Sequence, residues 1–451
     1  MYRNFSTPSI ATSQIRDPFD DRAAVNSQIS TNSSRSSGYS TARPKHVFKS
    51  YRLRGEYSQP WRADKRLKRT RINNIIILAF TFLGLCLLAF LAFDGWRSGR
   101  SGDYCLVFQD DFASGLSASS WTREVQLGGF GTGSFDWTTS SAQNAFVDGD
   151  GLHIVPTLTT ESTDISEDQL FDGYSLNLTR AGGDGSCTST SLAACAARSN
   201  STTGAVIPPV RSARLSTKGK HKIKYGRVEV VAKMPRGDWL WPAIWMMPED
   251  SHYGAWPASG EIDIAELRGN APGSTADGGR DTVSGTLHWG PDETLDGYRL
   301  THGAKALRRD DFSTGYHTFG LEWSEGHIAV YLDSRLKQVM YVGFDGDRTM
   351  WERGHFAGET INQTRVEDPW EQTGRSNTPF DREFYLILNV AVGSRNGWFS
   401  DHEDQKPWID ANNNAAGQFI RAKDEWLPTW GKGYDRGMTV KSVKMWKEGK
   451  C

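Results

Sequence analysis

The chain has 451 residues, a formal net charge of −1, 46 glycines and 17 tryptophans. This near-neutral balance, without a basic aromatic patch in the globular part, argues against a nucleic-acid partner. The length allows one large domain with appendages or two to three small domains, and the glycine and aromatic content suits an all-β domain with many turns.

The first 72 residues are expected to form a disordered cytosolic tail. Residues 1–60 are rich in Ser, Arg, Asn and Thr and poor in aliphatic side chains. Such a segment cannot bury enough apolar surface to offset its ordering entropy. The tail ends in a basic cluster, which consists of Arg62, Lys65, Arg66, Lys68, Arg69 and Arg71.

An uncharged apolar run from Ile75 to Phe93 follows, and it predicts a transmembrane helix over residues 73–93. More cations precede this run than follow it, so the positive-inside rule predicts a cytosolic N-terminus. A cleaved signal peptide or a buried core helix are the alternatives, but the run is long and lies far from the N-terminus. The prediction is a single-pass type II membrane protein, with a stalk over 94–103 and a lumenal or extracellular domain over 104–451.

Four of the five cysteines lie after the apolar run and would meet an oxidising compartment, whereas Cys86 lies inside it. Four cysteines allow three pairings. The close spacing of Cys187 and Cys195 favours one bridge. Cys105 and Cys451 flank the domain, and domain termini often lie close together, which favours a Cys105–Cys451 bridge. No Cys-x-x-Cys or histidine cluster accompanies them, so no metal site is expected.

Three asparagines beyond the apolar run, Asn177, Asn200 and Asn362, begin Asn-x-Ser/Thr acceptors for glycosylation. Asn4 and Asn32 match the same pattern but should be cytosolic. No sequence feature indicates the oligomeric state.

The globular part is predicted to consist of short strands. They are expected at 107–112, 145–155, 222–234, 282–289, 317–323, 327–332, 384–392 and 438–446. Many short strands between turns, without a long helical period, favour a β-sandwich. Residues 157–220 have low strand content and are expected to form a long surface insertion.

The stretch 256–266 carries three acids, Glu261, Asp263 and Glu266, with no Lys or Arg between them. Side chains alternate faces along a strand, which places Glu261 and Asp263 on one face. Glu266 needs one extra residue, a bulge near Ala265, to reach that face.

Three adjacent acids repel one another, which raises the pKa of at least one. Glycoside hydrolysis needs a pair of carboxyl groups with separated pKa values. The alternative is a solvated strand face whose acids meet Lys and Arg. Four tryptophans upstream could offer flat apolar faces to sugar rings or belong to the core; they are Trp239, Trp241, Trp245 and Trp256.

Together with the segment Trp241-Pro-Ala-Ile-Trp245, the acidic stretch resembles glycoside hydrolase family 16. It is most similar to the branch of β-1,3-glucanases that also holds the animal β-1,3-glucan recognition proteins. The resemblance covers residues 104–446, and further matching segments are 128–137, 211–214, 225–229, 286–290 and 388–393. It implies a two-sheet β-jelly-roll sandwich whose concave sheet forms the substrate cleft.

The resemblance also implies site roles. Glu261 would be the nucleophile, Glu266 the general acid/base, and Asp263 would hold the proton arrangement between them. Retention of anomeric configuration requires the two outer carboxyl groups to lie about 5–5.5 Å apart. The aromatic walls would be Trp241, Trp245 and Trp256, and the residues binding sugar hydroxyls would be Asn144, Arg214 and His288.

The last three residues have structural alternatives as a turn asparagine, an ion-paired arginine and a core histidine. Many members of the family bind a structural calcium through an aspartate in the last strand. Lys441 stands at that place here and cannot ligate calcium as a carboxylate does, so no calcium site and no cofactor are expected.

The resemblance predicts a retaining, endo-acting hydrolase of β-1,3-glucan, of the laminarin type or mixed-linkage, that remodels cell-wall glucan. Two alternatives remain open. A transglycosylase would use the same intermediate with a sugar hydroxyl in place of water. A non-catalytic β-1,3-glucan-binding protein would belong to a different functional class, although recognition members typically lack the catalytic acids that this chain keeps.

Overall fold

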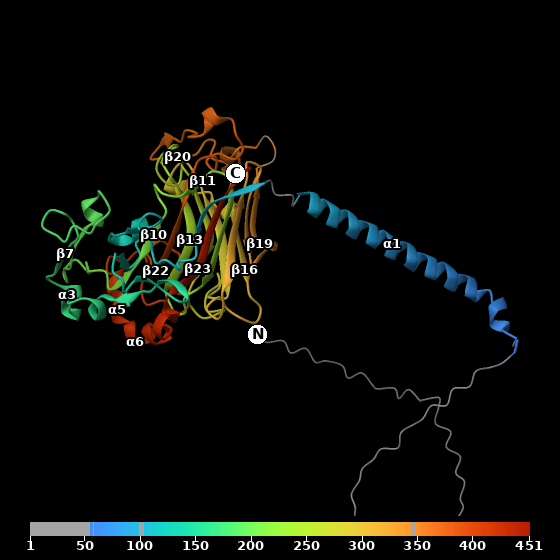
Figure 1. Ribbon diagram of the computed structural model, residues 1–451, viewed down its shortest axis with the longest axis horizontal. Coiled ribbons are helices and arrows are strands. Elements are labelled where there is room, and N and C mark those ends of the chain that lie inside the picture. The colour runs from blue at the N-terminus through green and yellow to red at the C-terminus, as the bar shows by residue number, and fades with distance from the viewer. Residues whose placement is uncertain (1–54, 57, 99–102, 345, 347) are drawn as a thin grey trace, which may run out of the picture. The chain divides into compact units, whose positions relative to one another are not determined.

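The computed structural model describes residues 55–56, 58–98, 103–344, 346 and 348–451 (Figure 1). The predicted tail and stalk lie partly outside these residues, and Asn4 and Asn32 lie wholly outside them. The chain divides into two compact units, Met1–Phe90 and Leu91–Cys451.

Helix α1 (Arg66–Ser98) follows a short 3-10 turn, η1 (Pro60–Ala63). Its segment Arg66–Gly95 has a mean hydropathy of 2.9 and, among the described residues, is the one helix long and apolar enough to cross a membrane, judged by length and composition alone. A helix that is apolar all round suits a membrane span or a large core, and these side chains are exposed. The helix begins before the predicted span of 73–93 and ends after it.

The remainder is an all-β sandwich of two sheets, as the strand pattern and the resemblance predict. The site sheet runs in the order β16-β15-β14-β13-β22-β10-β2, with β11 also paired to β22. Its strands are β2 (Thr122–Glu124), β10 (Arg214–Ser216), β11 (Lys222–Ile223), β13 (Leu240–Pro248), β14 (Glu261–Glu266), β15 (Thr282–His288), β16 (His302–Ala306) and β22 (Phe384–Val392).

The back sheet runs in the order β19-β18-β17-β12-β23-β5-β4, with β1 also paired to β23. Its strands are β1 (Tyr104–Asp110), β4 (Ala145–Asp148), β5 (Gly151–Ile154), β12 (Gly226–Lys233), β17 (His317–Trp323), β18 (His327–Leu332), β19 (Ser334–Gly343) and β23 (Met438–Glu448). Strand β12 alternates strictly between buried and half-buried residues, because one face meets the core and the other faces outward.

Smaller elements connect and extend the two sheets. The short strands are β3 (Asp136–Thr138), β6 (Thr157–Leu158), β7 (Ser175–Asn177), β8 (Ala196–Arg198), β9 (Val210–Ser212), β20 (Thr360–Ile361) and β21 (Thr364–Arg365). The short helices are α2 (Thr159–Ser162), α3 (Glu167–Phe171), α4 (Met350–Gly354), α5 (Ala415–Arg421) and α6 (Lys423–Trp426). The 3-10 turns are η2 (Gly128–Gly131), η3 (Leu192–Ala194), η4 (Glu293–Leu295), η5 (Tyr298–Leu300), η6 (Glu371–Thr373), η7 (Leu427–Thr429) and η8 (Gly433–Arg436).

The insertion predicted over 157–220 is shorter in the structure, because its last part contains strands of the domain's sheets. Its first part, with α3 and β7, projects to one side of the sheets in Figure 1. However, β9 belongs to a three-stranded sheet, and β10 lies inside the site sheet between β22 and β2. These strands have three residues each and contain Arg and Ser, so their sequences show no strand period. Their pairing depends on remote strands.

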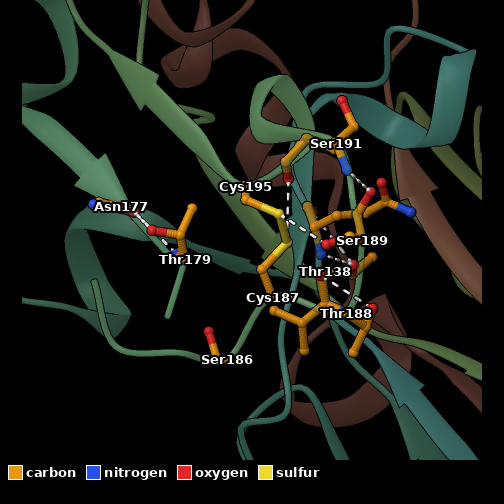
Figure 2. Close-up of a disulfide and its surroundings, with 12 residues drawn as sticks. Thr138, Asn177, Thr179, Ser186, Cys187, Thr188, Ser189, Ser191 and Cys195 are labelled. Atoms are coloured by element: carbon orange, nitrogen blue, oxygen red, sulfur yellow. Dashed lines mark hydrogen bonds between the residues drawn. A yellow bond between two sulfur atoms is a disulfide. The ribbon is translucent and has the colours of Figure 1, made fainter. Parts of the chain in front are cut away.

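Two disulfides close the domain. Cys105 in β1 is joined to the last residue, Cys451, with the Cα atoms 4.9 Å apart. Cys187 is joined to Cys195, which closes a short loop (Figure 2). That loop is held to the segment before η2, because Thr188 N–H donates to the carbonyl of Val125 at 2.9 Å.

Candidate active site

Strand β14 presents the three acids as a row. Against β13, Asp263 pairs with Trp245 and Ala265 pairs with Ile244, so Ile264 is the extra residue of a bulge. The bulge expected near Ala265 is therefore confirmed. The residues between the acids lie in the core at 0% exposure, which anchors the strand from behind.

Glu261 lies at the start of the row, opposite His288 of β15. The indole N–H of Trp256 donates to its Oε2 at 2.6 Å. Trp256 remains 41% exposed, so this indole both holds the carboxyl group and offers a free ring face. A short bond from a neutral donor favours the ionised carboxylate.

Glu266 lies at the other end of the row and is 9% exposed. The indole N–H of Trp241 donates to its Oε1 at 3.0 Å. Each outer acid therefore has one tryptophan donor of its own. This arrangement places the two carboxyl groups in separate surroundings, which is what two different catalytic roles require.

Asp263 is the most buried of the three acids, at 1% exposure, and faces a histidine. His288 Nε2 lies 3.3 Å from Asp263 Oδ2, while its Nδ1 lies 2.5 Å from Asp296 Oδ2. Burial lowers the pKa of His288, but the hydrogen bonds to the two aspartates outweigh burial and raise that pKa well above its ordinary value. The imidazolium form is therefore favoured at neutral pH.

The contacts of His288 bear on metal binding. Glu261, Asp263 and His288 offer ligand atoms that lie within 4.8 Å of one another. A metal ion needs the neutral imidazole, and both ring nitrogens of His288 are engaged by carboxylates. These residues therefore fit an ion-paired network better than a metal site.

Burial raises the pKa of every acid in the row. For Glu266, burial and the charge of Glu261 outweigh the opposing charge of His288 and the Trp241 hydrogen bond, and the pKa reaches about 7. For Glu261, burial and the charge of Asp263 raise the pKa to about 8, against the charge of His288 and the Trp256 hydrogen bond, so Glu261 and Glu266 compete for the same proton. Simultaneous ionisation of all three is disfavoured, so the row retains a proton near neutral pH.

A second cluster lies beside the row on β10 and β13. Arg214 is 8% exposed and its Nε donates to Glu124 Oε2 at 2.6 Å. Its guanidinium carbon, Cζ, lies 3.9 Å from the ring centroid of Phe130 and 4.6 Å from that of Trp245. Trp245 in turn donates its N–H to Asn389 at 2.7 Å. Phe130 has a φ of 57°, in the left-handed region that residues other than glycine rarely adopt.

Two residues predicted to contact sugar are placed differently. Asn144 is fully buried, and its amide donates to the carbonyl of Val155 and to Thr157 while its oxygen accepts from Thr139. A sugar hydroxyl would have to displace these bonds, so the structure favours a structural role. Trp241 is 8% exposed, and one face of its ring is covered by Trp398. Its contact with the row is the N–H donated to Glu266.

Sequence reasoning missed several residues around the row and around the Arg214 cluster, namely Phe130, Arg268, Asp296, Asn389 and Trp398. Phe130 and Asn389 lie in segments that carry the family resemblance, which could have singled them out. The other three come from loops far from β14 or just beyond it, and no local pattern distinguishes them from surface residues.

Residues 157–347 match the family described as glycosyl hydrolases family 16. The chain is 38% identical over 349 residues to a beta-1,3-glucan-binding protein of Penaeus monodon, which covers 76% of this chain and 90% of that protein. It is 30% identical over 321 residues to a glucan endo-1,3-beta-glucosidase of Cryptopygus antarcticus, covering 70% and 87%. The laminarinase catalytic domain from Thermotoga maritima MSB8 aligns at 22% identity and a TM-score of 0.45, covering 77% of this chain and all of that one.

Proposed function

The chain belongs to glycosyl hydrolase family 16, and from that premise we propose that it is a retaining, endo-acting hydrolase of β-1,3-glucan. The observation that carries the proposal is the complete acid row, with a separate tryptophan donor on each outer carboxyl group. A protein that only binds glucan needs no such pair. The relatives include a protein named for glucan binding and one named as a glucosidase, so their names alone do not decide between the two functions.

The proposed reaction has two displacements. In the first, a carboxylate oxygen of Glu261 bonds to the anomeric carbon while Glu266 gives its proton to the leaving glycosidic oxygen. In the second, Glu266 takes a proton from water, and the resulting nucleophile releases the sugar from Glu261 with retained configuration. Asp263 and the cationic His288 keep the charge of the row balanced through both steps. The spacing of about 5–5.5 Å between the outer carboxyl groups stays a prediction.

Sugar binding is proposed to use the aromatic rings beside the row. Trp256 has an exposed ring next to Glu261, and flat apolar ring faces suit the C–H faces of a glucan. Trp245, with Arg214 stacked on it, supplies a second ring. Glucan polysaccharide is accordingly the proposed substrate, without a cofactor.

A time course on laminarin tests the proposal. We expect products shorter than the starting chains from the earliest samples, with the β-anomer formed first in the NMR spectrum. Products longer than the starting chains would instead support the transglycosylase alternative. Laminarin binding without any new reducing ends would support the binding protein and contradict the enzyme.

The alkaline limit of the activity is expected between about pH 7 and about pH 8, where the row of coupled acids loses the proton that Glu266 must donate. Glu266 must hold a proton in order to donate it, and burial raises its pKa to about 7. As pH rises through this range the active form is lost, so kcat/KM on laminarin should fall about tenfold per pH unit above it. The measurement is a pH profile of initial rates. An unperturbed glutamate has a pKa of about 4.3. An alkaline limit at about that pH would contradict the assignment of Glu266 as the general acid.

We further propose that the chain is a type II membrane glycoprotein, with the segments 1–72, 73–93, 94–103 and 104–451 as tail, span, stalk and lumenal or extracellular domain. The apolar helix α1 and the two disulfides support this, and of the three glycosylation acceptors Asn200 and Asn362 are exposed. Protease added to intact microsomes should remove only residues before the span. Protection of the tail would contradict the orientation. A role in remodelling the cell's own wall glucan follows from this placement.

A further inference from the structure

We infer that Trp398 and Arg268 are positioning residues for the proposed acid/base Glu266, which they serve by holding the indole of Trp241 in place. The inference deepens the proposed function and rests on it. Neither residue is hydrogen-bonded to Glu266, so Trp398 would act through Trp241, and Arg268 would act through Trp398 and through its own charge.

The first contact is between the two indoles. The rings of Trp241 and Trp398 lie parallel, at an angle of 10°, with centroids 4.8 Å apart. A stacked partner fixes the plane of an indole and therefore the direction of its N–H. The N–H of Trp241 points at Glu266 Oε1, at 3.0 Å. The stack thus determines where the carboxyl group receives its hydrogen bond.

The second contact is between Arg268 and Trp398. Its guanidinium carbon lies 4.1 Å from the ring centroid of Trp398. Its Nε and one terminal nitrogen also donate to the backbone carbonyl of Trp398, at 3.0 and 2.6 Å. The same arginine therefore binds both the ring and the backbone of Trp398. Its side chain is 9% exposed, and its ion-pair partner Asp277 is 63% exposed.

Arg268 lies close to Glu266 in the sequence. It follows Glu266, the last residue of β14, by two residues, so one short segment carries both the acid and the arginine that binds Trp398. Trp398 comes from a different segment, whose next residue, Phe399, accepts a hydrogen bond from the buried Lys406 at 2.7 Å. The hydrogen bonds between Arg268 and Trp398 therefore join two segments that are 130 residues apart in the sequence.

The electrostatic consequence is defined by the groups that face Glu266. On its own strand these are Glu261 and Asp263, on β15 His288, and beyond the strand Arg268. The Trp241 hydrogen bond and the charge of Arg268 both favour the ionised form of Glu266, against burial. Loss of either should raise the pKa of Glu266 and move the alkaline limit of activity to higher pH.

The test compares four variants of the full chain: Trp398→Ala, Trp398→Phe, Arg268→Met and Asp277→Asn. We expect Trp398→Ala and Arg268→Met to lower kcat on laminarin on the order of tenfold, a fraction of the effect of a general acid, and to shift the alkaline limit upward. Trp398→Phe keeps a stacked ring and should stay near the parent. Asp277→Asn removes an exposed partner and is the matched control.

A second substrate separates positioning from a general structural role. An activated aryl glycoside leaves without a proton, so its first step does not depend on the placement of Glu266. The kcat/KM of the variants, which reports this first step, should fall much less on the aryl glycoside than on laminarin. Equal losses on both substrates with an unchanged pH limit, or a Trp398→Phe variant as impaired as Trp398→Ala, would overturn the inference.

If the parent does not cleave laminarin, the proposed function fails, and the inference is then tested by titration. The carboxyl signal of Glu266, assigned by its loss in Glu266→Gln, can be followed by ¹³C NMR in glutamate-labelled protein. A higher pKa in Trp398→Ala than in the parent would support the inference, and an identical pKa would overturn it.

Discussion

Glu261→Gln is expected to abolish turnover on laminarin and on activated aryl glycosides alike. An amide cannot attack the anomeric carbon, so no glycosyl-enzyme forms, whatever the leaving group. The change keeps the size of the side chain, and the Trp256 N–H can still donate to the amide oxygen. The protein should therefore stay folded, which a melting curve checks. Glu293→Gln, at an exposed acid outside β14, is the matched control and should retain the parent's rate.

Glu266→Gln should show a different pattern. On laminarin the leaving oxygen receives no proton, and the rate should fall on the order of 10²–10⁴-fold, the usual contribution of a general acid. An aryl glycoside with a good leaving group should still form the intermediate. Added azide should then restore its turnover, because azide needs no general base. The product should be the β-azide, which NMR identifies.

Asp263→Asn should be impaired but active, because Asp263 balances the charge of its neighbours and of His288 and does not bond to the substrate. The contrast between the three variants carries the assignment. Azide rescue of Glu261→Gln with retained configuration would contradict it. So would a fully inactive Asp263→Asn beside a normal Glu266→Gln. If all three behaved like the parent, the row would be only a strand face.

The largest effect on stability is expected from Lys406→Met. The side chain of Lys406 is 0% exposed, and its ammonium donates to Asp401 at 2.6 Å, to Asp410 at 2.5 Å and to the carbonyl of Phe399. Removing the cation leaves two acids without their partner. Removing one partner of a buried ion pair typically lowers the free energy of unfolding by about 3–5 kcal/mol. Because Asp401 is 32% exposed, we expect a loss at the lower end, about 3 kcal/mol.

Lys423→Met is the matched control for that variant. Lys423 pairs with Glu167 at 2.7 Å, but the two side chains are 30% and 60% exposed, so the pair should contribute at most about 1 kcal/mol. Denaturant unfolding of both variants gives the comparison. If Lys406→Met were as stable as Lys423→Met, the buried ammonium would not hold its loop. The triple variant with Asp401→Asn and Asp410→Asn should recover part of the loss, because no unpaired charge remains.

The acid row was predictable from the sequence because its geometry is local. Alternation along a strand and a single extra residue are enough to place Glu261, Asp263 and Glu266 on one face, and the pairing of Ala265 with Ile244 confirms the bulge. Helix α1 and most strands of the two sheets could likewise be predicted from the sequence, because apolar runs and period-two patterns do not depend on remote partners.

The surroundings of the row depended on contacts between distant segments. His288 was predicted to bind sugar, and in the structure Asp296 and Asp263 hold it as a cation. Trp241 was predicted as an aromatic wall of the cleft, and in the structure one face of its ring is stacked on Trp398. Local spacing was enough to predict which acids share a face. The protonation of these acids and their hydrogen-bond donors could not be predicted locally, because burial and charge depend on the distant segments that pack against the row.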